Sequence, residues 1–160
     1  MKIDRRIASM CATACFVLAL QAGIVSAAPS AVLYDQTDNP ASSAIISQDN
    51  EPENDIYDCQ AAADFQVPDG FTWKVTKITT PGEYQGFGTA QSLHVTVYAN
   101  SGGLPGPSVC EYPFVTVFTG GSTGTFVITL PVTGCTLTQG AYWVSVQANM
   151  MWDEGTWNWR

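Results

Sequence analysis

The chain is poor in basic residues and in histidine. Among its 160 residues, six Lys and Arg stand against fourteen Asp and Glu, and His94 is the one histidine. Such a chain should repel nucleic acid and anionic membranes, because phosphate binding requires a stripe of basic side chains. Any catalytic or zinc site that needs an imidazole has to use His94. A histidine at the surface of a strand is the simpler interpretation, so no catalytic residue is predicted.

Helical periodicity is also missing. No segment keeps a helical spacing of apolar residues over three turns, whereas several short runs alternate apolar and polar residues. In the clearest run, 92–99, Leu93, Val95 and Val97 alternate with His94, Thr96 and Tyr98. This pattern predicts a strand with one buried and one wet face, followed by a turn at 100–106, where Asn, Ser, Gly and Pro gather.

Similar runs predict the rest of an all-β domain. The further predicted strands are 31–35, 42–47, 59–67, 71–79, 109–118, 124–131 and 141–148. The acidic segment 48–58 and the glycine-rich segment 81–88 are predicted as loops, and a break in alternation between Val75 and Ile78 predicts a bulge or twist. Together these features predict an antiparallel β-sandwich, jelly-roll or immunoglobulin-like, of about seven to nine strands.

The first residues predict export. Lys2, Arg5 and Arg6 precede an apolar run without charge from 7 to 25, as in a secretory signal peptide. We place the signal peptide at 1–27 and one domain at 28–160, secreted to the extracellular space or the periplasm. Cleavage after Ala28 and a retained membrane anchor are the alternatives. After cleavage at Ala27 no membrane span is expected.

Three cysteines follow the predicted signal: Cys59, Cys110 and Cys135. Export permits disulfides, and an odd number leaves one thiol over. Cys110 and Cys135 stand at the ends of predicted strands, so we predict a bridge between them that adds about 3 to 4 kcal/mol to stability. Cys59 is then either a buried free thiol or the partner of a cysteine outside this chain.

Acidic residues crowd the segment after residue 48. Asp49, Glu51, Glu53 and Asp55 provide hard oxygen ligands at short spacing, which is the chemistry that calcium requires. Their order does not match an EF-hand loop, and the segment has no glycine. A solvated acidic loop is the simpler interpretation, and calcium is the one cofactor that the sequence suggests.

Tryptophans divide into two predicted groups. Trp73 and Trp143 lie in predicted strands and are assigned to the core. Trp152, Trp157 and Trp159 crowd the terminal segment and are predicted to offer a platform for sugar rings or for a protein partner. Because Trp157 and Trp159 alternate with polar residues up to the last position, the segment is either an edge strand or the point where a longer domain is truncated.

Four segments resemble uncharacterised extracellular β-sandwich modules of secreted bacterial proteins. They are 33–36 (LYDQ), 57–65 (YDCQAAADF), 97–106 (VYANSGGLPG) and 140–148 (GAYWVSVQA), and the last is similar to the final strand of pre-peptidase C-terminal domains. The resemblance implies a jelly-roll attachment that sits in longer proteins beside enzymatic, adhesive or sorting domains. It carries no catalytic residue to this chain.

These observations predict a secreted, non-catalytic module with an accessory, adhesion or structural role. The predicted partners are an extracellular polysaccharide, or another domain or protein at the cell surface. The alternative is a carbohydrate-binding module that uses exposed tryptophans. A hydrolase with paired carboxylates ranks third, because thirteen acids remain after residue 27 but sequence spacing cannot show which of them face each other.

Overall fold

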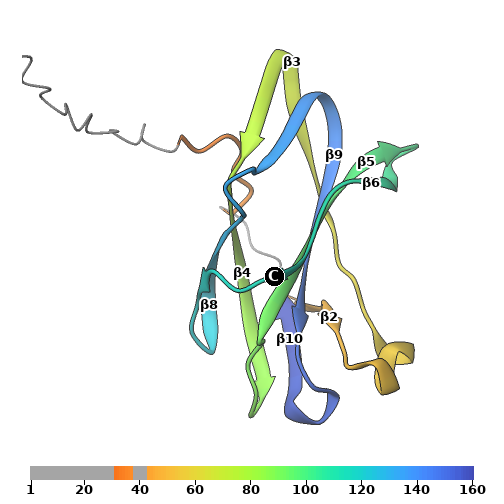
Figure 1. The fold of residues 1–160 in the computed structure, drawn as a ribbon, viewed down its shortest axis with the longest axis vertical. Coiled ribbons are helices and arrows are strands. Elements are labelled where there is room, and N and C mark those ends of the chain that lie inside the picture. Colours follow the sequence, from red (N-terminus) through yellow and green to blue (C-terminus); the bar gives the residue numbers. More distant parts are fainter. Residues whose placement is uncertain (1–30, 38–42) are drawn as a thin grey trace, which may run out of the picture. The chain divides into compact units, whose positions relative to one another are not determined.

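Two β-sheets make up most of the computed structural model, which describes residues 31–37 and 43–160 (Figure 1). Sheet A contains β1 (Ile45–Ile46), β4 (Lys77–Gly86), β7 (Phe118–Thr119), β8 (Thr123–Thr129) and β10 (Gly155–Trp159), in the order β1-β10-β4-β8-β7. Sheet B contains β2 (Gln48–Asp49), β3 (Ala63–Val75), β5 (Ser92–Ser101), β6 (Leu104–Val115) and β9 (Cys135–Asn149), in the order β2-β9-β5-β6, with β3 paired to β9. Two short 3-10 helices, η1 (Pro52–Tyr57) and η2 (Trp152–Glu154), complete the described elements.

Strand β5 follows the alternation that the sequence predicts. Leu93, Val95 and Val97 are buried in the core, and β5 pairs with β9 on one side and with β6 on the other. The hairpin from β5 to β6 turns on Gly102 and Gly103, whose φ angles are 64° and 85°. A two-residue turn with two positive φ angles suits the right-handed twist of the paired strands, and glycine adopts these angles without strain.

One core cluster joins the two sheets. Sheet A contributes Phe126 and Ile128 from β8 and Trp157 from β10, and sheet B contributes strands β5 and β9. The Phe126 ring meets the Trp157 ring edge-on with 5.6 Å between ring centroids. The predicted all-β class is confirmed, and the shared core is consistent with a sandwich, because each sheet hides its apolar face against the other.

Single residues carry the chain from one sheet to the other. Ser47 links β1 in sheet A to β2 in sheet B, and Thr76 links β3 in sheet B to β4 in sheet A. Val75 pairs with Cys135, while Lys77, two residues later, pairs with Thr129 in the other sheet. The break in alternation near Val75 is therefore a crossing between sheets, not the predicted bulge within one strand.

Several predicted boundaries are wrong. Residues 31–37 contain no strand, and the predicted loop 48–58 holds β2 and η1. The glycine-rich segment 81–88 lies mostly inside β4, where a Cβ on Gly82 would stand 2.8 Å from the Trp157 ring. Glycine is needed there for close packing and not for a turn, a distinction that composition does not reveal.

The predicted disulfide is confirmed. Cys110 of β6 is bonded to Cys135 at the start of β9, with 5.9 Å between their Cα atoms. Cys59 has no bond to either of them, and its side chain is exposed, so the prediction of a buried thiol is wrong. The bridge ties the edge strand β6 to the longest strand of sheet B.

The predicted signal peptide, 1–27, and its cleavage site lie outside the described residues. Within 31–37 and 43–160, no helix has the length and apolarity needed to cross a membrane.

Candidate functional site

The side chains of sheet B that point away from the core form a polar and aromatic layer, which we call the outer face of sheet B. Thr96, Ser145 and Gln147 in this layer are buried. Register places His94 opposite Gln147, Thr96 opposite Ser145 and Tyr98 opposite Trp143 along the pair β5 and β9. Glu111 on β6 extends the face, since it lies opposite Thr96 on the other side of β5. The face therefore follows from strand alternation and register.

Tyr98 and Trp143 are the aromatic part of this face. Both are partly exposed. The Tyr98 hydroxyl donates to Gln60 Oε1 at 3.0 Å and accepts from Gln60 Nε2 at 2.7 Å, and Trp143 Nε1 donates to Asn100 Oδ1 at 3.0 Å. These hydrogen bonds hold both rings in place before any ligand arrives, which lowers the entropy lost on binding.

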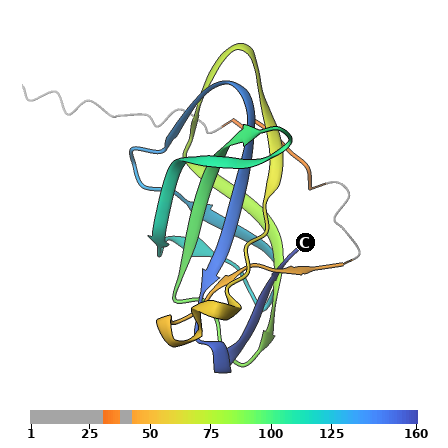
Figure 2. The ribbon, with the colours of Figure 1, turned by 90° about the vertical axis from the view of Figure 1, so that its right-hand side faces the viewer.

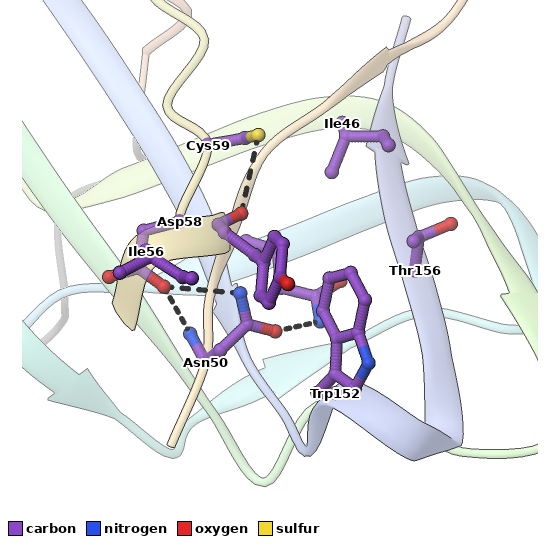
Figure 3. Close-up of a pocket in the computed structure, with 9 residues that line it drawn as sticks. Ile46, Asn50, Ile56, Asp58, Cys59, Trp152 and Thr156 are labelled. Atoms are coloured by element: carbon purple, nitrogen blue, oxygen red, sulfur yellow. Dashed lines mark hydrogen bonds between the residues drawn. The ribbon is translucent and has the colours of Figure 1, made fainter. Parts of the chain in front are cut away.

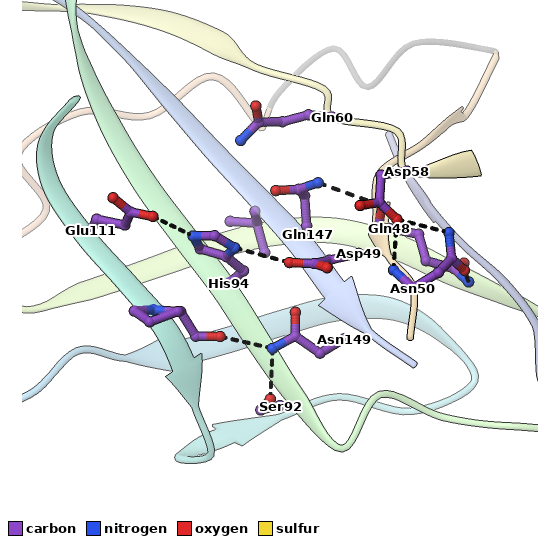
Figure 4. A network of polar contacts seen from close by, with 12 residues as sticks. Gln48, Asp49, Asn50, Asp58, Gln60, Ser92, His94, Glu111, Gln147 and Asn149 are labelled. Atoms are coloured by element: carbon purple, nitrogen blue, oxygen red, sulfur yellow. Dashed lines mark hydrogen bonds and ion pairs between the residues drawn. The ribbon is translucent and has the colours of Figure 1, made fainter. Parts of the chain in front are cut away.

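His94 ties three strands together across the face (Figure 4). Its Nδ1 lies 3.1 Å from Asp49 Oδ2 on β2, and its Nε2 lies 3.1 Å from Glu111 Oε1 on β6. A neutral imidazole carries one N–H, so only the imidazolium donates to both carboxylates at once. With both ring nitrogens engaged, the histidine acts here as a structural tie.

The segment that includes β2 and residues 58–60 lies over one end of this face. Figure 2 shows the segment of β2 and η1, coloured from orange to gold, beside the end of β9. Gln147 Nε2 donates to the carbonyl of Cys59 at 3.0 Å, and Gln48 and Cys59 exchange backbone hydrogen bonds. Ser145 Oγ, two residues before Gln147 on β9, is buried and has no hydrogen-bond partner among the described residues.

A pocket of about 340 Å³ lies on the other side of β2 (Figure 3). Three stretches of chain line it: Ile46, Gln48 and Asn50; Ile56, Tyr57, Asp58 and Cys59; Trp152 and Thr156. The rings of Tyr57 and Trp152 stack with 4.2 Å between centroids and 25° between planes. Both rings stay about half exposed, at 48% and 46%. We call this site the Tyr57–Trp152 pocket.

Glu51 holds Trp152 in this position. Its Oε2 accepts a hydrogen bond from the Trp152 backbone N–H at 2.8 Å, and its Oε1 accepts one from Asn54 Nδ2. The N–H of Trp152 is the main reason that the pKa of Glu51 lies below its ordinary value, because it stabilises the charged carboxylate.

The four predicted calcium ligands do not converge. Asp49 contacts His94, and Glu51 accepts a hydrogen bond from the Trp152 backbone. Glu53 and Asp55 are exposed on η1. No group of three or more His, Cys, Asp or Glu side chains that could hold a metal ion occurs in 31–37 or 43–160. The geometry therefore gives the calcium prediction no support.

The three tryptophans of the predicted platform do not share one exposed surface. Trp157 is fully buried and Trp159 packs against the core, so Trp152 is the one member with a broadly exposed ring. Trp73 is in the core as predicted, but Trp143 is not. The signal for Trp143 was present in the sequence, because Tyr142 and Val144 are assigned to one face and Trp143 must then lie on the other.

Comparisons with known proteins add no relative. No family model, curated protein or solved structure matches the chain. The resemblance to pre-peptidase C-terminal domains therefore stays a prediction, and function is inferred from the residues of the two sites.

Proposed function

We propose that the chain is a secreted, non-catalytic accessory or adhesion module that binds an extracellular polysaccharide on the outer face of sheet B. The observation that carries the proposal is the cross-strand pair of Tyr98 and Trp143, which is partly exposed and held by Gln60 and Asn100. Aromatic rings offer apolar faces to the C–H groups of a sugar ring, and amide side chains beside them match its hydroxyl groups.

The carboxylates of the outer face of sheet B suit a neutral polysaccharide better than an acidic one. Asp64 lies opposite Trp143 in register, and Asp49 and Glu111 flank His94. Uronic acid or sulfate groups would meet like charge at this face. The ligand that we propose is therefore a neutral glycan, read by stacking and by hydrogen bonds to its hydroxyl groups.

Export and a module-like role have separate support. The charged start and apolar run of 2–25 favour a signal peptide, and the Cys110–Cys135 bridge is typical of an oxidising compartment. No catalytic step is proposed, because both nitrogens of His94 are engaged by carboxylates. The jelly-roll resemblance points the same way, since such modules are attachments without catalytic residues.

Affinity electrophoresis in gels that contain neutral polysaccharides, with pull-down on insoluble glucans, xylan and chitin, tests the proposal. Trp143→Ala and Tyr98→Ala should each weaken binding about tenfold or more, as expected for a central aromatic contact. Trp143→Phe keeps a ring but loses the bond to Asn100, so its affinity should fall between those of the parent and the alanine variant.

The matched control is Phe87→Ala. Phe87 is a fully exposed aromatic residue beyond the end of β4, away from the outer face of sheet B, and its loss should leave binding unchanged. Equal binding by folded Trp143→Ala and the parent would refute the proposal. Failure to bind any glycan, together with a mass that rises with concentration, would instead indicate protein docking.

A further inference from the structure

The Tyr57–Trp152 pocket takes no part in the proposed glycan site. Gln48 points toward the pocket, while the next residue, Asp49, points to His94 on the outer face of sheet B. Large apolar side chains surround the opening and remain exposed, Ile56 at 84% and Ile46 at 41%. A volume of about 340 Å³ lies at the low end of ligand pockets, so the occupant is small.

The two amide side chains of the lining, Gln48 and Asn50, are already hydrogen-bonded within the protein. Gln48 Oε1 accepts from the Trp157 backbone N–H at 3.1 Å, and Gln48 Nε2 donates to Asn50 Oδ1 at 2.6 Å. Asn50 in turn donates to Asp58 Oδ1 from its backbone N–H and from Nδ2. A ligand with several N–H or O–H donors would lose its hydration here and find few acceptors in return.

The surroundings of the pocket are negative. Segments 43–59 and 150–157 contain seven carboxylates and no Lys or Arg. Asp58 is part of the pocket wall, and its Oδ2 accepts no hydrogen bond from the described residues. Glu51 lies beside the Trp152 backbone. This field favours a cation and disfavours an anion.

We propose that the Tyr57–Trp152 pocket binds a small quaternary ammonium cation. Such a cation carries no N–H donor, so the shortage of free acceptors leaves no N–H group unpaired. Its methyl groups suit the apolar wall. Because the two rings stack on each other, its positive charge is attracted by the outer face of one ring of the pair and by the Asp58 carboxylate. The proposal is independent of the glycan site, because the two sites share no side chain.

Isothermal titration of the purified protein with choline and with 3,3-dimethyl-1-butanol tests the proposal. The alcohol has the shape of choline without its charge. Choline should bind with a dissociation constant of about 1 mM or tighter, and at least about tenfold more tightly than the alcohol. Trp152→Ala should weaken choline binding about tenfold, and Trp152→Phe, which keeps a ring, should weaken it less.

A matched pair of variants tests how much the negative charge of the pocket wall contributes to choline binding. Asp58→Asn removes a carboxylate from the pocket wall and should weaken choline binding severalfold. Glu53→Gln removes the same charge from an exposed position on η1 that does not line the pocket, and should have little effect. Trp143→Ala, on the outer face of sheet B, should leave choline binding unchanged.

Three results would overturn the proposal: equal binding of choline and its neutral analogue, no choline binding at millimolar concentration, or full binding by folded Trp152→Ala. Flotation with phosphatidylcholine vesicles, compared with phosphatidylglycerol vesicles, separates two sources of the same cation. Flotation with phosphatidylcholine supports a lipid headgroup as the source, and binding of choline alone supports a free ligand.

Discussion

The outer face of sheet B and the Tyr57–Trp152 pocket lie on either side of β2 and are built in different ways. The face consists of side chains from neighbouring strands, whose polar atoms are bonded to one another. The pocket consists of three short stretches that meet beside two 3-10 helices, and its surface is mostly apolar. The register of β5 with β9 is continuous along the face, whereas the pocket depends on a few contacts such as that of Glu51 with Trp152.

Strand β2 serves both regions because side chains alternate along a strand. Gln48 is buried and links the sheets, with hydrogen bonds to Asn50 and to the Trp157 backbone. Asp49 faces the other way and pairs with His94. Two adjacent residues thus connect the two sites without giving them a common side chain.

The largest predicted effect comes from the disulfide. Replacement of Cys110 and Cys135 by alanine should lower the free energy of unfolding by about 3 to 4 kcal/mol, measured by urea denaturation. Because the bridge holds β6, hydrogen exchange should rise more at Glu111 and its neighbours on β6 than at η1. If β6 and η1 lost protection equally, β6 would support the outer face of sheet B and the pocket to the same extent. That result would contradict the comparison between the two regions.

Gln48→Ala should come second, with a loss of about 2 to 3 kcal/mol, because the buried backbone N–H of Trp157 and the Asn50 side chain lose their partner. Ligand binding at both sites should weaken, since Gln48 joins the two sheets between these sites. Gln66→Ala removes an exposed side chain from β3 and should stay within about 0.5 kcal/mol. Similar thermal unfolding of the two variants would show that Gln48 is not a link between the sheets.

The smallest predicted effect is local and depends on pH. The pKa of Glu51 is lower in the folded chain than its ordinary 4.5, so its contact with Trp152 stabilises the fold above that value and is lost as the pH falls through the folded pKa. Acidification should therefore change Trp152 fluorescence, and Glu51→Gln should remove this step. Trp143→Phe should leave the step intact, because the Trp143 indole is held by Asn100 and not by Glu51.

Local alternation predicted much of one site and little of the other. The buried Val95 and Val97 and the opposite placement of Tyr98 all follow from the period of two in 92–99. Because sandwich cores often contain tryptophan, Trp143 is predicted to lie in the core, although the alternation of its own strand places it on the opposite face. Nothing local indicated that Trp157 is buried while Trp152 is exposed, because that depends on Phe126 and Gly82 packing against Trp157.

The sequence by itself determined the β class, the alternating faces of β5 and β9, the Cys110–Cys135 pair and the acidic character of the chain. The β class, the alternating faces and the acidic character are encoded in neighbouring residues or in composition, and the disulfide follows from the position of its two cysteines at the ends of predicted strands. The tertiary structure decided which strands pair, where Ser47 and Thr76 carry the chain between sheets, and how Tyr57 comes to stack on Trp152. Contacts such as Gln48 with Trp157 join residues 109 positions apart, and only the packing of both sheets on one core selects them.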